Sequence, residues 1–131
     1  MSFLSKLHID GQEFNVLDFD TEFSQGKDAT GKPMGEPTGG TIKIVIEATQ
    51  NTDFLSWMLN SALTKDGKII FYRRDAMSKM KELNFVKAYC VNYREQFSST
   101  NDVPMKITLI LVAKELNFGN AKFLNNWIAF D

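Results

Sequence analysis

Alternation of apolar and polar residues is the dominant pattern along this chain of 131 residues. In the clearest example, residues 41–49, Ile42, Ile44 and Ile46 fall on one face of an extended strand and Lys43 and Glu47 on the other. Weaker versions of this pattern predict further strands over residues 3–9, 13–24, 68–74, 81–97 and 105–118, and a last one in the apolar tail 119–131. The dipeptide Asp10-Gly11 predicts a hairpin turn between the first two strands.

Two of these strands need additional features to bury their apolar residues. Apolar residues of segment 13–24 change parity after Val16, which predicts a β-bulge there. Segment 105–118 is apolar on both faces from Ile107 to Ala113, so it requires two covers. A barrel interior supplies one cover, and a helix or a neighbouring subunit must supply the other.

Segment 53–63 is the one stretch with a helical period. Asn51 or Thr52 would cap it, Lys65-Asp66-Gly67 would end it, and its apolar stripe would comprise Phe54, Leu55, Met58, Leu59, Ala62 and Leu63. Strands before and after a single helix predict a mainly β fold, an antiparallel β-barrel or sandwich with one flanking α-helix. No linker or repeat divides the chain, so we expect one domain over residues 1–131.

Residues 25–40 form a Gly/Pro-rich segment far longer than a hairpin turn requires. Its glycines permit unusual backbone shapes, while its prolines stiffen it into an extended arm. We expect this loop to mediate assembly through Gly26, Gly31, Lys32, Pro33, Met34, Gly35, Pro37, Gly39 and Gly40, with Met34 as an apolar anchor near the tip.

Composition excludes several classes of function. With 15 basic and 16 acidic residues, the net charge of -1 gives no electrostatic footprint for nucleic acid or an anionic membrane. Cys90 is the single cysteine, which excludes an internal disulfide and a cysteine-rich metal site. There is no signal peptide and no apolar run long enough to span a membrane, so we expect a cytoplasmic chain that leaves the cell only without a standard signal.

Isolated candidates for chemistry have simpler structural explanations. Gly26 to Lys32 matches the spacing of a phosphate-binding loop, but Pro33 replaces the required Ser or Thr and no helix can follow. His8 is the only histidine and shares a strand face with Lys6, which is typical of a surface residue. We expect Cys90 to be a packed thiol, and Arg73-Arg74 to be a solvated strand end.

Three carboxylates, Asp18, Asp20 and Glu22, recur at every second residue and therefore share one strand face. Their spacing suits a glycosidase pair or a calcium ion. A solvated face paired with Lys6 or Lys43 is the simpler explanation, and the lining of a shared lumen is a third. We favour these last two, with charges facing solvent or a lumen, and expect no catalytic, cofactor or metal site in the chain.

Residues 3–20, Phe-Leu-Ser-Lys-Leu-His-Ile-Asp-Gly-Gln-Glu-Phe-Asn-Val-Leu-Asp-Phe-Asp, together with 28–33, Asp-Ala-Thr-Gly-Lys-Pro, and 39–44, Gly-Gly-Thr-Ile-Lys-Ile, resemble the Hcp (TssD) tube proteins of bacterial type VI secretion systems. The resemblance implies a small barrel with one helix, six copies of which close into a ring. It also implies that rings stack into a tube which a sheath drives outward with a spike and baseplate, and which carries effectors in its lumen. The long loop would then reach adjacent subunits, and the protein would be cytoplasmic before firing and secreted afterwards.

The sequence therefore predicts a structural, non-enzymatic tube subunit that functions by self-association. The first alternative is the tail-tube protein of a phage or another contractile injection particle. A small-ligand-binding β-barrel would instead be a monomer with an apolar internal pocket. A glycosidase would use Asp18 and Glu22.

Overall fold

The structure is a computed structural model that describes residues 3–49, 54–73, 78–100, 102 and 104–125. It contains seven strands and one short helix, in the order β1 Phe3–Ile9, β2 Gln12–Lys27, β3 Pro33–Glu47, α1 Leu55–Leu59, β4 Lys65–Arg73, β5 Lys79–Phe97, β6 Met105–Phe118 and β7 Ala121–Leu124. Every strand pairs antiparallel with its neighbours.

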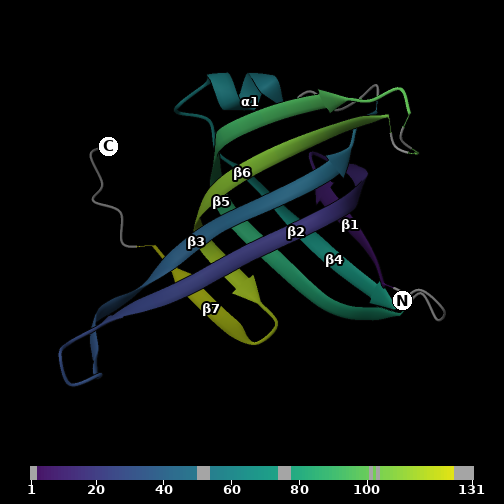
Figure 1. The fold of residues 1–131 in the computed structure, drawn as a ribbon. Helices are drawn as coiled ribbons and strands as arrows, with labels where there is room; N and C mark the ends of the chain where they lie inside the picture. Colours follow the sequence, from purple (N-terminus) through teal and green to yellow (C-terminus); the bar gives the residue numbers. More distant parts are fainter. Residues whose placement is uncertain (1–2, 50–53, 74–77, 101, 103, 126–131) are drawn as a thin grey trace.

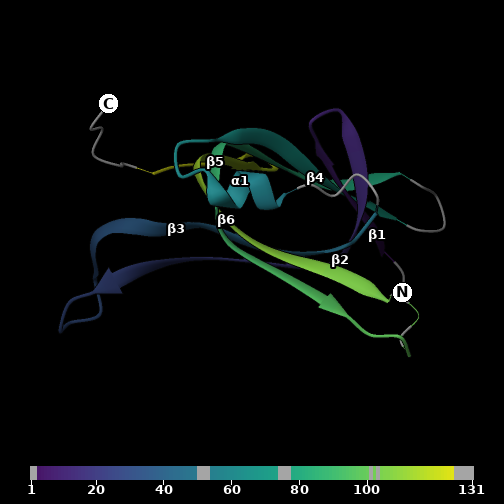
Figure 2. The same cartoon turned by 90° about the horizontal axis from the view of Figure 1, so that it is seen from above.

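The strands form one sheet that closes on itself. Their order is β3-β2-β1-β4-β5-β6-β7, and an additional pairing between β3 and β6 completes a barrel (Figure 1). Seen from above, β2, β3, β6 and the C-terminal half of β5 form one layer (Figure 2). β1 and β4 lie behind this layer, and α1 lies at the end of the barrel where the two layers meet. The predicted antiparallel barrel with one flanking helix is confirmed.

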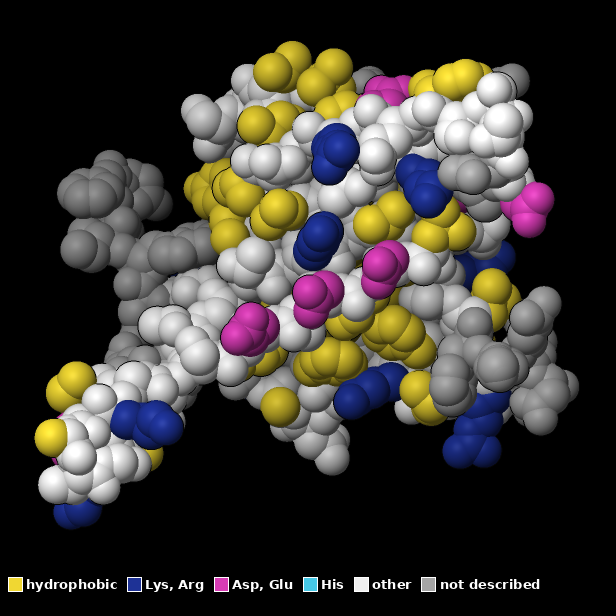
Figure 3. Space-filling view, in the orientation of Figure 1, with side chains coloured by type: hydrophobic (Ala, Val, Ile, Leu, Met, Phe, Trp, Pro, Cys, Tyr) yellow, Lys and Arg dark blue, Asp and Glu magenta, His cyan; other side chains and the backbone are white. Residues whose placement is uncertain are grey.

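The four strands β2, β3, β6 and β5 present one broad face away from the barrel, which we call the outer sheet face (Figure 3). One row of directly paired residues crosses these strands at one level: Asp18, Val45, Thr108 and Arg94. The next row contains Asp20, Lys43, Ile110 and Asn92. Ile110 and Val112 of β6 are half-buried on this face, and α1 lies at the end of the barrel and not over them. The second cover predicted for β6 is therefore not α1.

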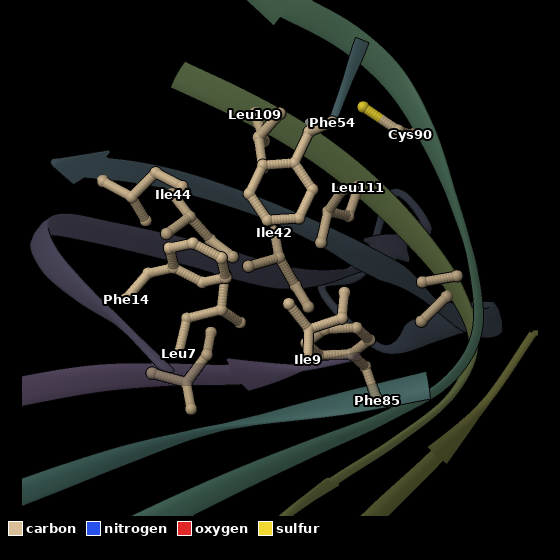
Figure 4. Close-up of a cluster of buried hydrophobic side chains, with 14 of the residues drawn as sticks. Leu7, Ile9, Phe14, Ile42, Ile44, Phe54, Phe85, Cys90, Leu109 and Leu111 are labelled. Carbon is tan, nitrogen blue, oxygen red and sulfur yellow. The ribbon is translucent and has the colours of Figure 1, made fainter. Parts of the chain in front are cut away.

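The barrel interior is filled with apolar side chains (Figure 4). Ile42, Ile44 and Ile46 of β3 are fully buried and lie beside Leu111, Leu109 and Ile107 of β6, as the alternating pattern predicted. From the other layer, β1, β4 and β5 contribute Leu7, Ile9, Ile69, Leu83 and Phe85. Burying one such side chain contributes about 1.5–3 kcal/mol, so this core is what holds the two layers together.

The helix is shorter than predicted, and the predicted apolar stripe is buried only in part: Phe54 is buried, and Met58 and Leu63 pack against the core. It spans five residues, and the described residue at its N-cap, Phe54, makes no side-chain capping hydrogen bond. Trp57 is buried and its indole N–H donates to the Leu63 carbonyl, whereas Leu55 and Leu59 of the predicted stripe are exposed. The chain leaves the helix early because residues 65–67 belong to β4, which pairs with β1 and β5. The predicted caps Asn51 and Thr52 lie outside the described residues.

Other strand predictions agree with the structure within a few residues. The register of β2 against β3 shifts between Val16 and Asp18, which confirms the predicted bulge. In the predicted last strand only 121–124 is β-structure among the described residues, and 126–131 lies outside them. None of the described helices is long and apolar enough to cross a membrane.

Candidate assembly site

The segment predicted as a loop, residues 25–40, is instead the far end of a long hairpin. β2 and β3 remain paired as far as Gly26 with Met34 and Lys27 with Pro33, so the two strands project together beyond the rest of the sheet as an arm (Figure 1). Pairing tolerates the prolines because Pro33 begins its strand and the register shifts between Ser24 and Gly26 loop out the stretch that contains Pro37. The prediction of an unpaired loop was wrong, whereas that of an extended arm was correct.

Asp28 organises the turn at the tip of this arm. Its Oδ1 accepts hydrogen bonds from the Thr30 hydroxyl at 2.7 Å, the Thr30 N–H at 2.9 Å and the Lys32 N–H at 3.0 Å. The hydrogen bond from the Thr30 hydroxyl, followed by those from the backbone of Lys32 and Thr30, holds the pKa of Asp28 below its ordinary value. The turn is thus ordered by local side-chain chemistry, and the side chain of nearby Met34 is 60% exposed.

At the base of the arm, Phe23, Gly39, Gly40, Phe123 and Asn125 meet in a cluster that we call the arm joint. The ring of Phe23 packs edge-on against Phe123 with 5.1 Å between centroids. Gly40 has a φ of 84°, and a Cβ there would lie 2.5 Å from the Asn125 amide nitrogen. That nitrogen donates to the Ala113 carbonyl at 2.7 Å.

The arm joint marks the point where β3 leaves β6. Their pairing extends from Glu47 with Lys106 to Thr41 with Val112, directly before the positive φ of Gly40. Beyond it, β7 pairs with residues 115–118 on the same edge of β6. The Asn125 amide donates a hydrogen bond to the Ala113 carbonyl, which lies between the segments of β6 that pair with β3 and β7. Gly39 and Gly40 were predicted from the sequence, but their partners were not, because no local pattern links them to Phe123 and Asn125.

The three carboxylates lie where the parity of β2 placed them. Asp18, Asp20 and Glu22 are all exposed, and Figure 3 shows a row of three acidic side chains with basic and hydrophobic ones beside it on the outer sheet face. Lys43 pairs directly with Asp20 across β2 and β3. Lys6 pairs with Glu13 and not with these carboxylates: its ammonium lies 3.3 Å from Glu13 Oε1. Within the described residues, no group of three His, Cys, Asp or Glu side chains could hold a metal ion.

Two edges of the sheet extend past their neighbours. β1 pairs with β2 only as far as Asn15, and β4 pairs with β5 only as far as Ala88. Among the described residues, no strand therefore pairs with the β1 side of β2 from Val16 onward or with the β4 side of β5 from Tyr89 onward. We call these the β2 edge, 16–22, and the β5 edge, 89–95.

Each open edge carries a bulge with an exposed apolar side chain, namely Leu17 at 41% and Val91 at 47%. Open edges are sites where another chain can add strands. Neither edge was predicted from the sequence, because both depend on where β1 and β4 stop pairing. The bulge after Val16 was the one available signal.

Other candidates lie apart from these features. Cys90 is buried, its thiol donates to the Asn92 carbonyl at 3.4 Å, and burial raises its pKa, as expected of a packed thiol. His8 is partly exposed beside Glu13, with 3.6 Å between Nε2 and Oε2, and borders an open surface hollow of about 550 Å³. Gly26 lies within β2 and no helix follows Lys32, so the phosphate-loop spacing has no matching structure. Arg73 ends β4 and is exposed, and Arg74 lies outside the described residues.

Comparisons with known proteins point to one family. The profile of the family described as "Hemolysin coregulated protein Hcp (TssD)" matches residues 1–128. Among solved structures, Hcp1 from Flavobacterium johnsoniae has a TM-score of 0.87 and 34% identity, covering 93% of this chain and 99% of that one. No curated protein matches.

More distant structures share the fold alone. Hcp1 from Salmonella typhimurium has a TM-score of 0.74 at 10% identity, covering 94% of this chain and 92% of that one. A chain in the sheath-tube complex of an extracellular contractile injection system, PVC, has a TM-score of 0.54 at 17% identity, covering 87% and 86%.

Proposed function

This chain belongs to the Hcp (TssD) family and is a tube subunit of a type VI secretion system, and from that premise we propose that its copies close into a hexameric ring by joining the β5 edge of one copy to the β2 edge of the next. The single observation that supports this proposal most is the pair of open edges at the two sides of one four-stranded layer.

Strand direction favours this way of joining. Neighbouring strands in the order β2, β3, β6, β5 alternate in direction, so β2 and β5 run opposite to one another. A β2 strand of a second copy placed beside β5 is then antiparallel to it, and the alternation continues around the ring without a break. The rows that link Asp18 with Arg94 show that both open edges lie at the same level, so the joined copies need no large axial step.

The bulk of the subunit determines which face of the sheet lines the ring. β1, β4 and α1 all lie behind the four-stranded layer (Figure 2). Copies that are joined edge to edge have room for this bulk only on the outside of the ring. We therefore place the outer sheet face, including Asp18, Asp20 and Glu22, around the lumen.

The arm serves the stacking of rings in this proposal. It extends beyond the body of the sheet, and Met34 near its tip is exposed and free to pack against the next ring. Gly26, Gly31, Lys32, Pro33, Gly35 and Pro37 shape the arm, and Gly39 and Gly40 set its departure from the barrel. Sheath, spike, baseplate and effector proteins are the partners expected of a tube that is assembled in the cytoplasm and ejected whole.

The alternatives are supported less well. A ligand-binding barrel needs an internal pocket, whereas this interior is packed with side chains such as Ile44, Leu109 and Leu111. A glycosidase needs a substrate cleft, whereas Asp18 and Glu22 lie on an exposed strand face. The tube of an injection particle shares the fold, but that similarity is weaker than the one to Hcp1. We propose a purely structural subunit of one domain, without catalysis, cofactor or metal.

Native mass spectrometry together with negative-stain images of the purified protein tests the ring. We expect one discrete oligomer of six copies with a central hole. A strict monomer across micromolar concentrations would contradict the proposal.

A second variant tests the arm separately. Replacing residues 27–37 with a short Gly-Ser turn changes loop-closure entropy only slightly, so the barrel should fold and rings should form. Stacking into tubes should be lost. If this variant stacks and supports secretion like the wild type, the arm is a passive connector.

A further inference from the structure

The β2 edge and the β5 edge differ in charge. The β2 edge presents the carboxylates of Asp18, Asp20 and Glu22 on the outer sheet face, and the β5 edge presents the guanidinium of Arg94 on the same face. All four side chains are exposed. None of the four has an ion-pair partner among the described residues.

Arg94 and Asp18 occupy the same row but are too far apart to interact within one subunit. Three strand spacings separate them, which amounts to about 14 Å. Water and salt largely screen exposed charges at such a distance. In a ring closed through the open edges, a single strand spacing of about 5 Å separates Arg94 from the β2 carboxylates of the next copy. The charges become neighbours only through assembly.

We propose that Arg94 of one copy forms a charged seam with Asp18 and the adjoining carboxylates of β2 of the next copy, and that this seam determines which edges join. This inference rests on the proposed ring and adds what determines which edges of the subunits join. Opposite charges on facing strands stabilise the pairing, and like charges directly opposite destabilise it. The occupant of each edge is thus a second copy of this chain, presenting its other edge.

The same charges oppose the two-fold alternatives. Two β2 edges paired about a two-fold axis through Asp20 would place Asp20 against Asp20 and Asp18 against Glu22. Two β5 edges would bring the Arg94 side chains together. A ring built from isologous contacts would need both of these pairings in alternation, whereas the pairing of β5 with β2 is head-to-tail and closes a ring with a single kind of contact. Charge therefore disfavours both isologous pairings and favours the head-to-tail one.

Other charged groups on this face do not satisfy the seam. Glu47 accepts a hydrogen bond from the Asn15 amide at 3.2 Å. Glu95, next to Arg94 in the chain, has the parity of the opposite face, since it pairs with the buried Ile107, and it accepts a hydrogen bond from the Tyr93 hydroxyl at 2.9 Å. Lys43 and Lys106 lie on the inner strands β3 and β6, one and two strands away from β2. Lys43 pairs with Asp20 across the sheet, but one lysine cannot balance three carboxylates.

Two charge-reversed variants test the seam in trans. Arg94→Asp gives a copy with two acidic edges, and Asp18→Lys with Glu22→Lys gives a copy with two basic edges while Asp20 stays opposite Lys43. We expect each variant to remain folded by circular dichroism and to require at least about tenfold more protein than the wild type to form rings. The loss should be larger at low salt, because salt screens the repulsion.

Mixing the two variants is the decisive step. An equimolar mixture should restore rings in which the variants strictly alternate, seen by native mass spectrometry as three copies of each. Arg73→Asp is the matched control, since it makes the same charge change on β4, away from the outer sheet face, and should leave rings unaffected.

Each unexpected result has a distinct meaning. Rings of wild-type stability from either variant alone would overturn the charged seam while leaving the ring intact. A mixture that stays unassembled, or that gives rings of random composition, would show that these residues do not face each other. A wild-type protein that forms no ring at any concentration would overturn the proposed function itself.

Discussion

Replacing Gly40 with Ala tests whether the arm joint is as closely packed as the structure shows. Gly40 has a φ of 84°, where an L-residue costs about 1–2 kcal/mol. The new Cβ would also lie 2.5 Å from the Asn125 amide nitrogen and 3.1 Å from the Phe123 ring. Asn125 must then shift, and its hydrogen bond to the Ala113 carbonyl is worth about 1 kcal/mol. We expect Gly40→Ala to lower the free energy of unfolding by about 2–3 kcal/mol.

Gly31→Ala is the matched control within the same arm. Its φ is 89°, but nothing lies within 4 Å of the added Cβ. Both substitutions stiffen the unfolded chain equally, so that contribution cancels in their difference. Gly31→Ala should therefore cost about 1–2 kcal/mol, from backbone strain alone. Urea unfolding followed by circular dichroism, at a protein concentration below that of ring formation, measures both variants.

A third variant identifies the contact responsible. In an Asn125→Ala background the clash with the amide is absent, so the additional cost of Gly40→Ala should fall toward that of Gly31→Ala. Equal destabilisation by Gly40→Ala and Gly31→Ala in the wild-type background would refute the reasoning, because it would show that Asn125 yields freely and does not hold the base of the arm.

Three further predictions concern single side chains. Burial raises the pKa of the Cys90 thiol, so a thiol reagent near pH 8 should label the folded protein slowly and the urea-unfolded protein quickly; equal rates would place the thiol at the surface. The folded-state pKa of Asp28 is lowered, so the hydrogen bonds that order the turn are fully present above the ordinary Asp pKa and are lost as the pH falls through the lowered value. An acid titration of the Thr30 and Lys32 amide resonances should follow this loss, and Asp28→Asn should show no such transition. Trp57→Phe leaves a void and removes the bond to the Leu63 carbonyl, so it should cost about 2 kcal/mol, against less than about 0.5 kcal/mol for Leu59→Ala on the exposed side of the same helix.

Local pattern was sufficient to predict the strands because their residues alternate between core and solvent. Segment 41–49 has Ile42, Ile44 and Ile46 fully buried, as the pattern requires, and the parity break after Val16 located a real bulge. The carboxylate row was placed correctly for the same reason. Such predictions succeed where the face of a residue depends only on its position along one strand.

Predictions failed where the answer depends on a partner distant in sequence. Residues 25–40 have the composition of a loop, yet β2 and β3 pair through them because Pro33 begins its strand and a register shift leaves Pro37 out of the pairing. The helix ends at Leu59 because the residues from Lys65 onward form β4 and pair with β5 and β1, which no helical period reveals. Asn125 and Phe123 hold the arm joint from β7 and its following residue, more than 80 positions away from Gly40.

Strand length connects the fold to assembly. β1 has 7 residues and β4 has 9, whereas their partners β2 and β5 have 16 and 19. In the part of the chain that the structure describes, the surplus length of β2 and β5 leaves two edges without a neighbouring strand, at one level and on strands of opposite direction. A monomeric protein would shield such edges, but here each carries an exposed apolar side chain, Leu17 or Val91, together with charges of opposite sign. The length of β2 and β5 that extends past β1 and β4 is thus where the proposed ring would join one copy to the next.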